Sequence, residues 1–180
     1  MPNITRLKVE FANVLILSAF FVIMSIILKE IKNMTKSELA RNYFKEGYNC
    51  CQAVVLAFCD EVNLDKETAL LIASSFGGGI GRLREVCGAV SGMCIIAGLK
   101  NGYISPKAKE EKIEHYKLIQ TLAGEFEKLN GSIICKVLTG IEKGSHVPEE
   151  RNKDYYEKRP CDCLVYDAAK ILDKYLKSVQ

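Results

Sequence analysis

The sequence lacks the motifs that mark several familiar kinds of site. It contains no Cys-x-x-Cys-His segment, so covalently attached haem is not expected. The glycine-rich segment at residues 77–82 lacks the Gly-Lys-Ser/Thr ending of a phosphate-binding loop, and no strand pattern precedes it. No basic block interleaves with aromatic residues and the net charge is only +3, so nucleic-acid binding is not indicated. The two histidines have no cysteine or histidine at zinc-finger spacing, and the carboxylates form no convincing acid–base pair.

Segments with the alternating pattern of a β-strand are also absent, which leaves helical periodicity as the main signal. We therefore expect an all-α fold, a compact multi-helix bundle. Hydrophobic residues make up 48% and charged residues 26% of the 180 residues, which suits one globular domain with its own core. The eight cysteines are too few for a short secreted disulfide scaffold. They lie in or at the starts of apolar helical segments, which indicates a reducing compartment and thiols that catalyse or ligate.

Residues 1–33 differ in character from the rest of the chain. Residues 14–28 carry no charge and only two polar side chains, Ser18 and Ser25, so they resemble a marginal transmembrane helix. No small-x-small cleavage site follows, unlike in a cleaved signal peptide. Basic residues are more numerous after the apolar run (Lys29, Lys32, Lys36 and Arg41) than before it (Arg6 and Lys8). By the positive-inside rule, an anchored protein would carry its C-terminal domain on the cytoplasmic side of the inner membrane.

A second interpretation removes this leader from the protein. Met34 opens the segment Met-Thr-Lys-Ser-Glu-Leu-Ala, which looks like the natural start of a bacterial protein. Residues 1–33 would then be a wrongly assigned start, and residues 34–180 a cytoplasmic helical domain. Membrane association is expected only if residues 1–33 are translated. We favour this second interpretation slightly and leave both open.

Capping residues divide the first part of the domain into helices. Thr35 with Glu38 and Asn49 with Gln52 match the capping-box pattern, and Asp65 is placed to cap a third helix. The glycine run at 77–82 predicts a tight connection. Residues 87–99 are apolar nearly all round, which predicts a buried central helix that is too short to span a membrane. Small residues at 88, 89 and 92 should let a neighbouring helix approach closely.

Three further helices are expected in the second part. Ser105 and the proline after it predict the start of a long amphipathic helix that runs to residue 129. Its expected apolar stripe is Ile113, Tyr116, Leu118, Ile119, Leu122 and Phe126. Ser132 is expected to cap a short helix that ends at Gly140, and Pro160 to begin the last helix. Between these two, residues 141–159 are polar and predict the longest loop.

Four cysteines fall where these helices are expected to begin: Cys50, Cys87, Cys135 and Cys161. A helix N-terminus presents unpaired N–H groups and a partial positive charge, both of which favour a thiolate over a thiol. A core does not need cysteine at four such positions. The pattern therefore predicts that the four converge on one thiol site, for redox chemistry or for holding a metal or cluster.

The motifs around these cysteines resemble a known family. They are Gly-Tyr-Asn-Cys-Cys-Gln-Ala-Val (47–54), Phe-Gly-Gly-Gly-Ile-Gly-Arg (76–82), Cys-Gly-Ala-Val-Ser-Gly (87–92), Cys-Lys-Val-Leu-Thr-Gly (135–140) and Cys-x-x-x-Val-x-Asp-Ala-Ala (161–169). In this order they resemble the C_GCAxxG_C_C family of redox-active proteins, over roughly residues 38–172. The resemblance implies that Cys50, Cys87, Cys135 and Cys161 are the family's cysteines. The other four look like extras: Cys51, Cys59, Cys94 and Cys163.

We first expect a thiol protein of the thiol–disulfide oxidoreductase kind. It would cycle between dithiol and disulfide or pass electrons to a redox partner that the sequence does not identify. Cys87 is predicted to attack, because Arg82 and Arg84 are close in sequence, and Cys50 to resolve. In a second interpretation the same four cysteines hold an iron–sulfur cluster or a zinc ion, although their spacings are long and irregular. A third is a membrane-tethered accessory protein whose cysteines are regulatory or structural.

Overall fold

The computed structural model describes residues 23–24, 34–142 and 144–179. In these residues the secondary structure is helical, with one isolated antiparallel bridge, Val86 to Ile134, as the only β-type pairing. The predicted all-α fold is therefore confirmed for this part of the chain. No helix in it is long and apolar enough to cross a membrane. All but two residues of the predicted span at 14–28 lie outside the described residues.

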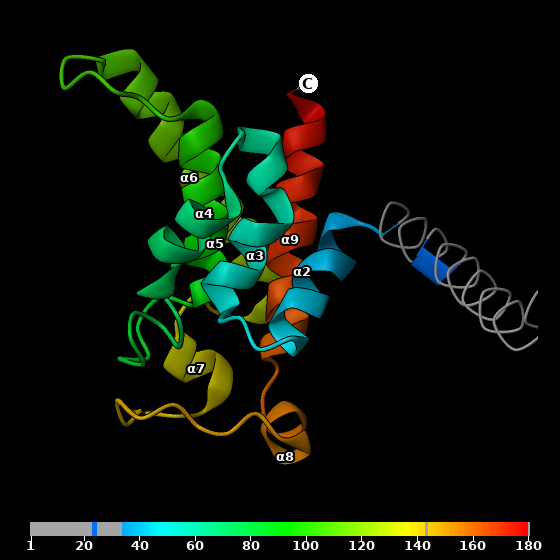
Figure 1. Ribbon diagram of the computed structural model, residues 1–180. Coiled ribbons are helices and arrows are strands. Elements are labelled where there is room, and N and C mark those ends of the chain that lie inside the picture. Colours follow the sequence, from blue (N-terminus) through cyan, green and yellow to red (C-terminus); the bar gives the residue numbers. More distant parts are fainter. Residues whose placement is uncertain (1–22, 25–33, 143, 180) are drawn as a thin grey trace, which may run out of the picture. The chain divides into compact units, whose positions relative to one another are not determined.

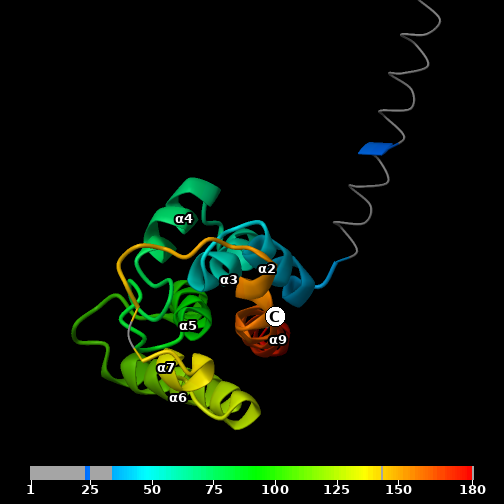
Figure 2. The same ribbon diagram turned by 90° about the horizontal axis from the view of Figure 1, so that it is seen from below.

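The described residues between 36 and 179 form one compact unit. Its helices are α2 (Lys36–Lys45), α3 (Cys50–Phe58), the 3₁₀ turn η1 (Cys59–Val62), α4 (Lys66–Ser74), α5 (Gly88–Asn101), α6 (Lys109–Asn130), α7 (Cys135–Thr139), α8 (Lys153–Glu157) and α9 (Cys161–Ser178). In Figure 1, α3, α5 and α9 lie at the centre of the bundle, with α7 and α8 below it. Seen from below, the segment from α7 to α8 passes across that end of the bundle (Figure 2).

The predicted buried central helix is α5. Its Val90, Met93 and Ile96 are at most 2% exposed, and it packs against α3, α6 and α9. Gly92 makes the contact with α3 possible, because a Cβ at this position would lie 2.9 Å from the carbonyl oxygen of Cys51 and 2.9 Å from Cβ of Val54. The predicted close approach of a neighbouring helix is therefore present.

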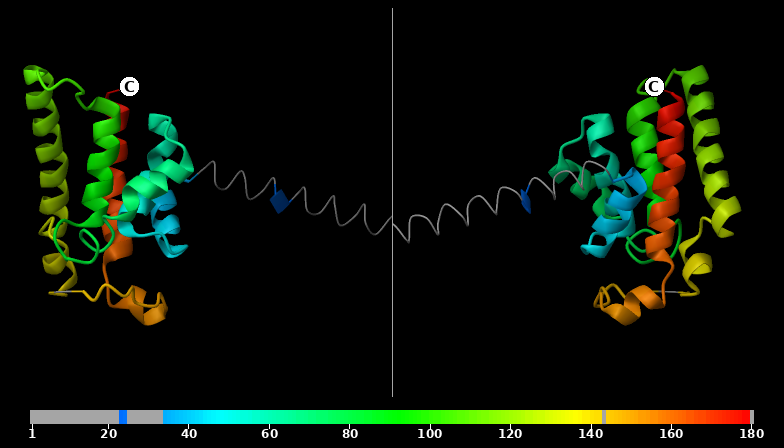
Figure 3. Two further views of the ribbon diagram at one scale, coloured as in Figure 1. Left: turned by 60° about the vertical axis from the view of Figure 1, so that its left-hand side comes forward. Right: turned by 90° about the vertical axis from the view of Figure 1, so that its right-hand side faces the viewer.

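The long helix α6 differs from the prediction in two respects. It begins at Lys109, not at Ser105, because Ser105 Oγ accepts a hydrogen bond from the backbone N–H of Lys107 and closes a turn there instead. Leu122 and Phe126 are buried, but Ile113 and Tyr116 are more than half exposed. α6 has 22 residues and α5 has 14, and the two helices run side by side in Figure 3. Part of α6 therefore extends beyond α5 and is not covered by it.

Two smaller corrections concern the end of the bundle that carries α7 and α8. The short helix α7 begins at Cys135, while Ser132 Oγ accepts from the N–H of Ile134 in the turn before it. The predicted loop at 141–159 contains α8, capped by Asn152, whose side chain accepts from the N–H of Tyr155. A helix of five residues has too few periodic positions to stand out in a polar sequence.

Candidate functional site

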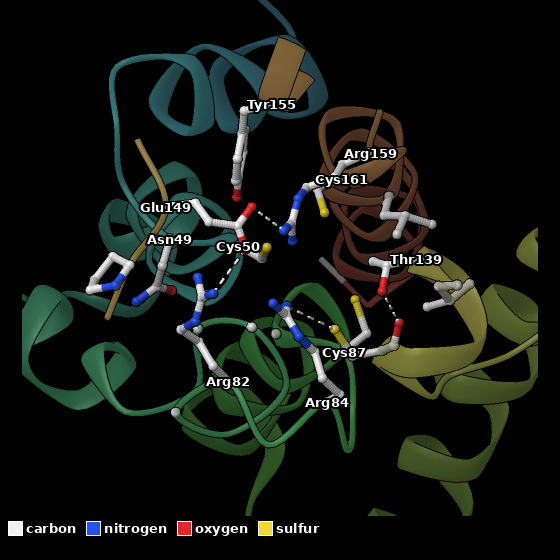
Figure 4. Close-up of a pocket in the computed structure, with 18 of the residues that line it drawn as sticks. Asn49, Cys50, Arg82, Arg84, Cys87, Thr139, Glu149, Tyr155, Arg159 and Cys161 are labelled. Atoms are coloured by element: carbon white, nitrogen blue, oxygen red, sulfur yellow. Dashed lines mark hydrogen bonds and ion pairs between the residues drawn. The ribbon is translucent and has the colours of Figure 1, made fainter. Parts of the chain in front are cut away.

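All four predicted cysteines line one cavity of about 300 Å³ at this end of the bundle. Cys50, Cys135 and Cys161 are the first residues of α3, α7 and α9, and Cys87 is the residue that precedes α5. Figure 4 shows Cys50, Cys87 and Cys161 around the same space. The convergence expected from the sequence is therefore present, while the chemical roles of the four thiols stay a prediction.

Local hydrogen bonding explains the position of Cys50. Asn49 Oδ1 accepts from the backbone N–H groups of Cys51 at 2.9 Å and Gln52 at 3.0 Å, and Gln52 Oε1 accepts from the N–H of Asn49 at 3.1 Å. This is the predicted capping box. It satisfies the first N–H groups of α3 and fixes Cys50 at the cavity wall.

The glycine-rich segment forms part of that wall. Gly78, Gly79, Ile80, Gly81, Arg82 and Arg84 all have φ between 55° and 72°, a left-handed conformation that glycine adopts without strain. Gly79 also allows Cys135 to come close, since a Cβ on Gly79 would lie 2.7 Å from Cβ of Cys135. The predicted tight connection is thus also a packing surface for Cys135. Gly88, the first residue of α5, allows Cys50 to come close in the same way, since a Cβ on Gly88 would lie 3.2 Å from Cβ of Cys50.

The isolated bridge brings Cys87 and Cys135 to the cavity together. The N–H of Cys87 donates to the carbonyl oxygen of Ile133 at 2.8 Å, and the N–H of Cys135 donates to that of Glu85 at 2.6 Å. Each cysteine therefore neighbours a residue of the bridge pair. Because side chains alternate across such a pairing, the side chains of Cys87 and Cys135 project to the same side.

Cys50 has the lowest thiol pKa of the four. Its pKa is lowered to about 7, first by a hydrogen bond from the Cys161 thiol and further by the charge of Arg151 and by a backbone hydrogen bond from Gly78, while burial opposes the shift. The pKa of Cys161 is strongly raised, mainly because it donates that hydrogen bond to Cys50 and also by burial. Cys50 is half-buried and Cys161 is 7% exposed.

Cys87 does not have the environment predicted for an attacking thiol. Burial, followed by the charge of Cys50, raises its pKa to about 12. The two arginines near it in sequence are directed elsewhere: Arg84 Nη1 lies 4.0 Å from Sγ of Cys135, and Arg82 Nη2 lies 2.9 Å from a carboxylate oxygen of Glu149. Burial raises the pKa of Cys135 despite Arg84. The electrostatics therefore favour Cys50, not Cys87, as the thiolate.

Sequence reasoning missed the residues that α8 and the segment before it bring to the cavity. Arg151 Nη1 donates to the carbonyl oxygens of Phe44 at 2.8 Å and Tyr48 at 2.9 Å, which ties the segment to the end of α2. Glu149 accepts from both Arg82 and Arg159 (Figure 4). Four arginines thus line the cavity together with one carboxylate: Arg82, Arg84, Arg151 and Arg159. Their sequence signal was only a polar, charged loop.

The other cysteines are absent from the cavity lining. Cys51 is buried in the core, Cys59 and Cys94 are half-buried, and Cys163 is exposed. Cys163 follows Cys161 by two residues in α9, which turns its side chain about 200° away. This agrees with their interpretation as extras.

For the iron–sulfur or zinc interpretation, no group of three or more His, Cys, Asp or Glu residues placed to hold a metal ion is found in the described part of the chain.

The sequence can now be placed among known proteins. The sequence profile of the family described as "Putative redox-active protein (C_GCAxxG_C_C)" matches residues 48–175, more than half of the chain. No curated protein and no solved structure matches it significantly. The matched region includes the four cysteines that line the cavity and the whole of the glycine-rich turn between α4 and α5. The chain therefore belongs to the C_GCAxxG_C_C family of redox-active proteins.

Proposed function

We propose that the protein exchanges electrons with disulfides, with Cys50 as the attacking thiolate and Cys161 as the resolving thiol. The observation that carries the proposal is that both thiols line the same cavity and that Cys161 is the largest cause of the lowered pKa of Cys50. A disulfide between them requires that their Cα atoms come within about 7 Å of each other. Relative to the sequence prediction, Cys50 takes the attacking role in place of Cys87, and Cys161 takes the resolving role in place of Cys50.

The reaction has two steps. The Cys50 thiolate attacks one sulfur of a substrate disulfide, so that a Cys50–substrate disulfide forms and the other half leaves as a thiolate. Cys161 then loses its proton to solvent and attacks Sγ of Cys50, which releases the second half as a thiolate. The substrate gains two electrons, and the protein is left with a Cys50–Cys161 disulfide. An external dithiol reductant restores both thiols by the reverse exchange.

The first step should lower the pKa of Cys161, which favours its attack in the second step. The pKa of Cys161 is raised mainly because its proton is held by Cys50. Once Cys50 is covalently capped it carries no charge, and this cause disappears. Cys161 then retains its position as the first residue of the 18-residue helix α9, which favours a thiolate.

Cys87 and Cys135 have a subordinate role in this proposal. Both are at most 5% exposed and both have raised pKa values, so they remain thiols at neutral pH. We expect them to react after Cys50 and Cys161.

Thiol counting on the reduced full chain tests the proposal. Bis(2-hydroxyethyl) disulfide should remove two thiols per molecule in a first phase, and Cys50→Ser should abolish that phase. Cys163→Ser is the matched control, since it removes an exposed cysteine and should leave the phase unchanged. Loss of the first phase in the control, or its survival in Cys50→Ser, contradicts the proposal. Iron, zinc and acid-labile sulfide measured on the same preparation test the cluster alternative.

A further inference from the structure

Arg84 is a buried cation without a matching anion. Its side chain lines the cavity (Figure 4), and the residue is only 2% exposed. Its Nε and Nη2 atoms have no hydrogen-bond partner, and Nη1 has only the long contact of 4.0 Å to Sγ of Cys135. A buried charge is costly unless it is paired and hydrogen-bonded. Its surroundings therefore lack a partner that such a group normally has.

No side chain of the cavity supplies that partner. Glu149 is the only carboxylate in the cavity lining, and it already pairs with Arg82 at 2.9 Å and with Arg159. Arg151 is satisfied by two backbone carbonyl oxygens. The lining thus contains four arginines against one carboxylate, and Arg84 is the one among them with two unpartnered nitrogens.

The two unpartnered nitrogens also have a geometric meaning. Nε and Nη2 share one edge of the planar guanidinium group, the edge to which a carboxylate binds with two parallel hydrogen bonds. Gly144 lies beside this edge, where a Cβ would be 3.1 Å from Nη2. The backbone at Gly144 therefore covers part of this edge, and both nitrogens are buried.

We propose that the substrate of this cavity is a small disulfide that carries a carboxylate, and that this carboxylate pairs with the uncompensated guanidinium group of Arg84 while Cys50 attacks the disulfide. This inference rests on the disulfide exchange proposed above and adds the class of substrate. A cavity of about 300 Å³ limits it to a low-molecular-weight compound. The reaction is the two-step exchange already described, and the carboxylate takes no covalent part in it.

Two disulfides of similar length separate charge recognition from thiol chemistry. We compare 3,3′-dithiodipropionate, which is dianionic at pH 7, with the neutral bis(2-hydroxyethyl) disulfide, each relative to its rate with free 2-mercaptoethanol. On the reduced full chain, the acidic disulfide should oxidise the Cys50–Cys161 pair about tenfold faster, the size of one charge-assisted hydrogen-bonded pair. Arg84→Gln should reduce this preference to within about twofold, chiefly by slowing the reaction with the acidic disulfide.

Arg41→Gln is the matched control variant. Arg41 also has an unpartnered Nε, but it stacks 4.3 Å from the ring centre of Tyr166 and does not line the cavity. Its loss should leave the preference intact. Should Arg84→Gln fail to fold, glutarate provides a test on the wild type: it should slow the acidic disulfide more than sodium chloride of equal ionic strength does.

The outcomes distinguish the two proposals. If wild type reacts equally fast with both disulfides, if the preference survives Arg84→Gln, or if glutarate acts only like salt, the acidic substrate is excluded while disulfide exchange stands. If neither disulfide oxidises Cys50 in the wild type, the proposed exchange itself is wrong.

Discussion

Cys50 and Cys161 line the same cavity, although one residue begins α3 and the other begins α9. The interaction between the two thiols shifts their pKa values in opposite directions. The pKa of Cys50 is lowered to about 7 and that of Cys161 is raised. This suits an exchange in which the attacking thiol is ionised while the resolving thiol stays protonated until the first step is complete.

Removal of Cys161 should make Cys50 less acidic. The hydrogen bond from Cys161 is the largest cause of the lowered pKa, so in Cys161→Ala the pKa of Cys50 should rise from about 7 toward its ordinary value of 9.0. The pH dependence of Cys50 alkylation by iodoacetamide measures it, with peptides identified by mass spectrometry. Cys163→Ala should give the wild-type midpoint. An unchanged midpoint in Cys161→Ala would show that the contact does not control Cys50.

Reactivity should follow pKa and not exposure. Cys163 is the exposed cysteine, but burial and the charge of Asp162 raise its pKa, whereas that of the half-buried Cys50 is lowered. At pH 7, limited alkylation should therefore label Cys50 before Cys163 by about tenfold or more, since the thiolate is the reactive form. Time-resolved peptide mapping gives the order, and faster labelling of Cys163 would contradict it.

The buried thiols should make stability fall at high pH. The pKa of Cys51 is raised, chiefly by burial, and that of Cys87 is raised to about 12, both from an ordinary 9.0. The folded state then binds these protons more tightly than the unfolded state. Their contribution is complete below pH 9 and is lost as the pH rises from 9 toward the folded-state values, by up to about 1.4 kcal/mol per pH unit for each group.

Urea unfolding of the reduced protein between pH 8 and 10 measures this loss. Cys51→Ala should decline less steeply than wild type, because one of the groups no longer ionises on unfolding. Lysines and tyrosines titrate in both proteins and cancel in the comparison. Parallel declines would mean that ionisation of Cys51 is not linked to unfolding.

Replacement of a glycine in α5 by alanine should destabilise the fold where α3 packs closely against that glycine. Gly92→Ala places a methyl group 2.9 Å from the carbonyl oxygen of Cys51, which should destabilise the fold by about 1–3 kcal/mol. Gly98→Ala, in the same helix, meets nothing within 4 Å and should be neutral or stabilising by about 0.5–1 kcal/mol. Chemical denaturation of both variants gives the two values. Equal effects would contradict the close contact of α3 with α5.

Much of the fold was predictable because its signals are local. The capping box of Asn49 and Gln52 and the cap at Asp65 involve residues within one turn, and the structure contains both. The apolar surface of α5 identifies a buried helix without knowledge of its neighbours. Ile113 and Tyr116 show the limit of this reasoning, since an apolar stripe does not say how much of α6 its neighbours cover.

The chemistry of the site was less predictable because it depends on distant residues. Arg82 and Arg84 are close to Cys87 in sequence, yet the left-handed turn that contains them directs one to Glu149 and the other to Cys135. The residue that lowers the pKa of Cys50 most, Cys161, is at the far end of the chain. Sequence spacing could select the four cysteines, but it could not assign their roles.

If Cys50 and Cys161 form one redox pair, the first disulfide to form in the protein must link these two residues. Reduced protein is oxidised with less than one equivalent of bis(2-hydroxyethyl) disulfide, quenched in acid, digested and mapped by mass spectrometry without reduction. The account predicts a peptide that links Cys50 to Cys161, with Cys87 and Cys135 still free. A first disulfide between Cys87 and Cys135, or a linkage that leaves Cys50 reduced, would contradict it.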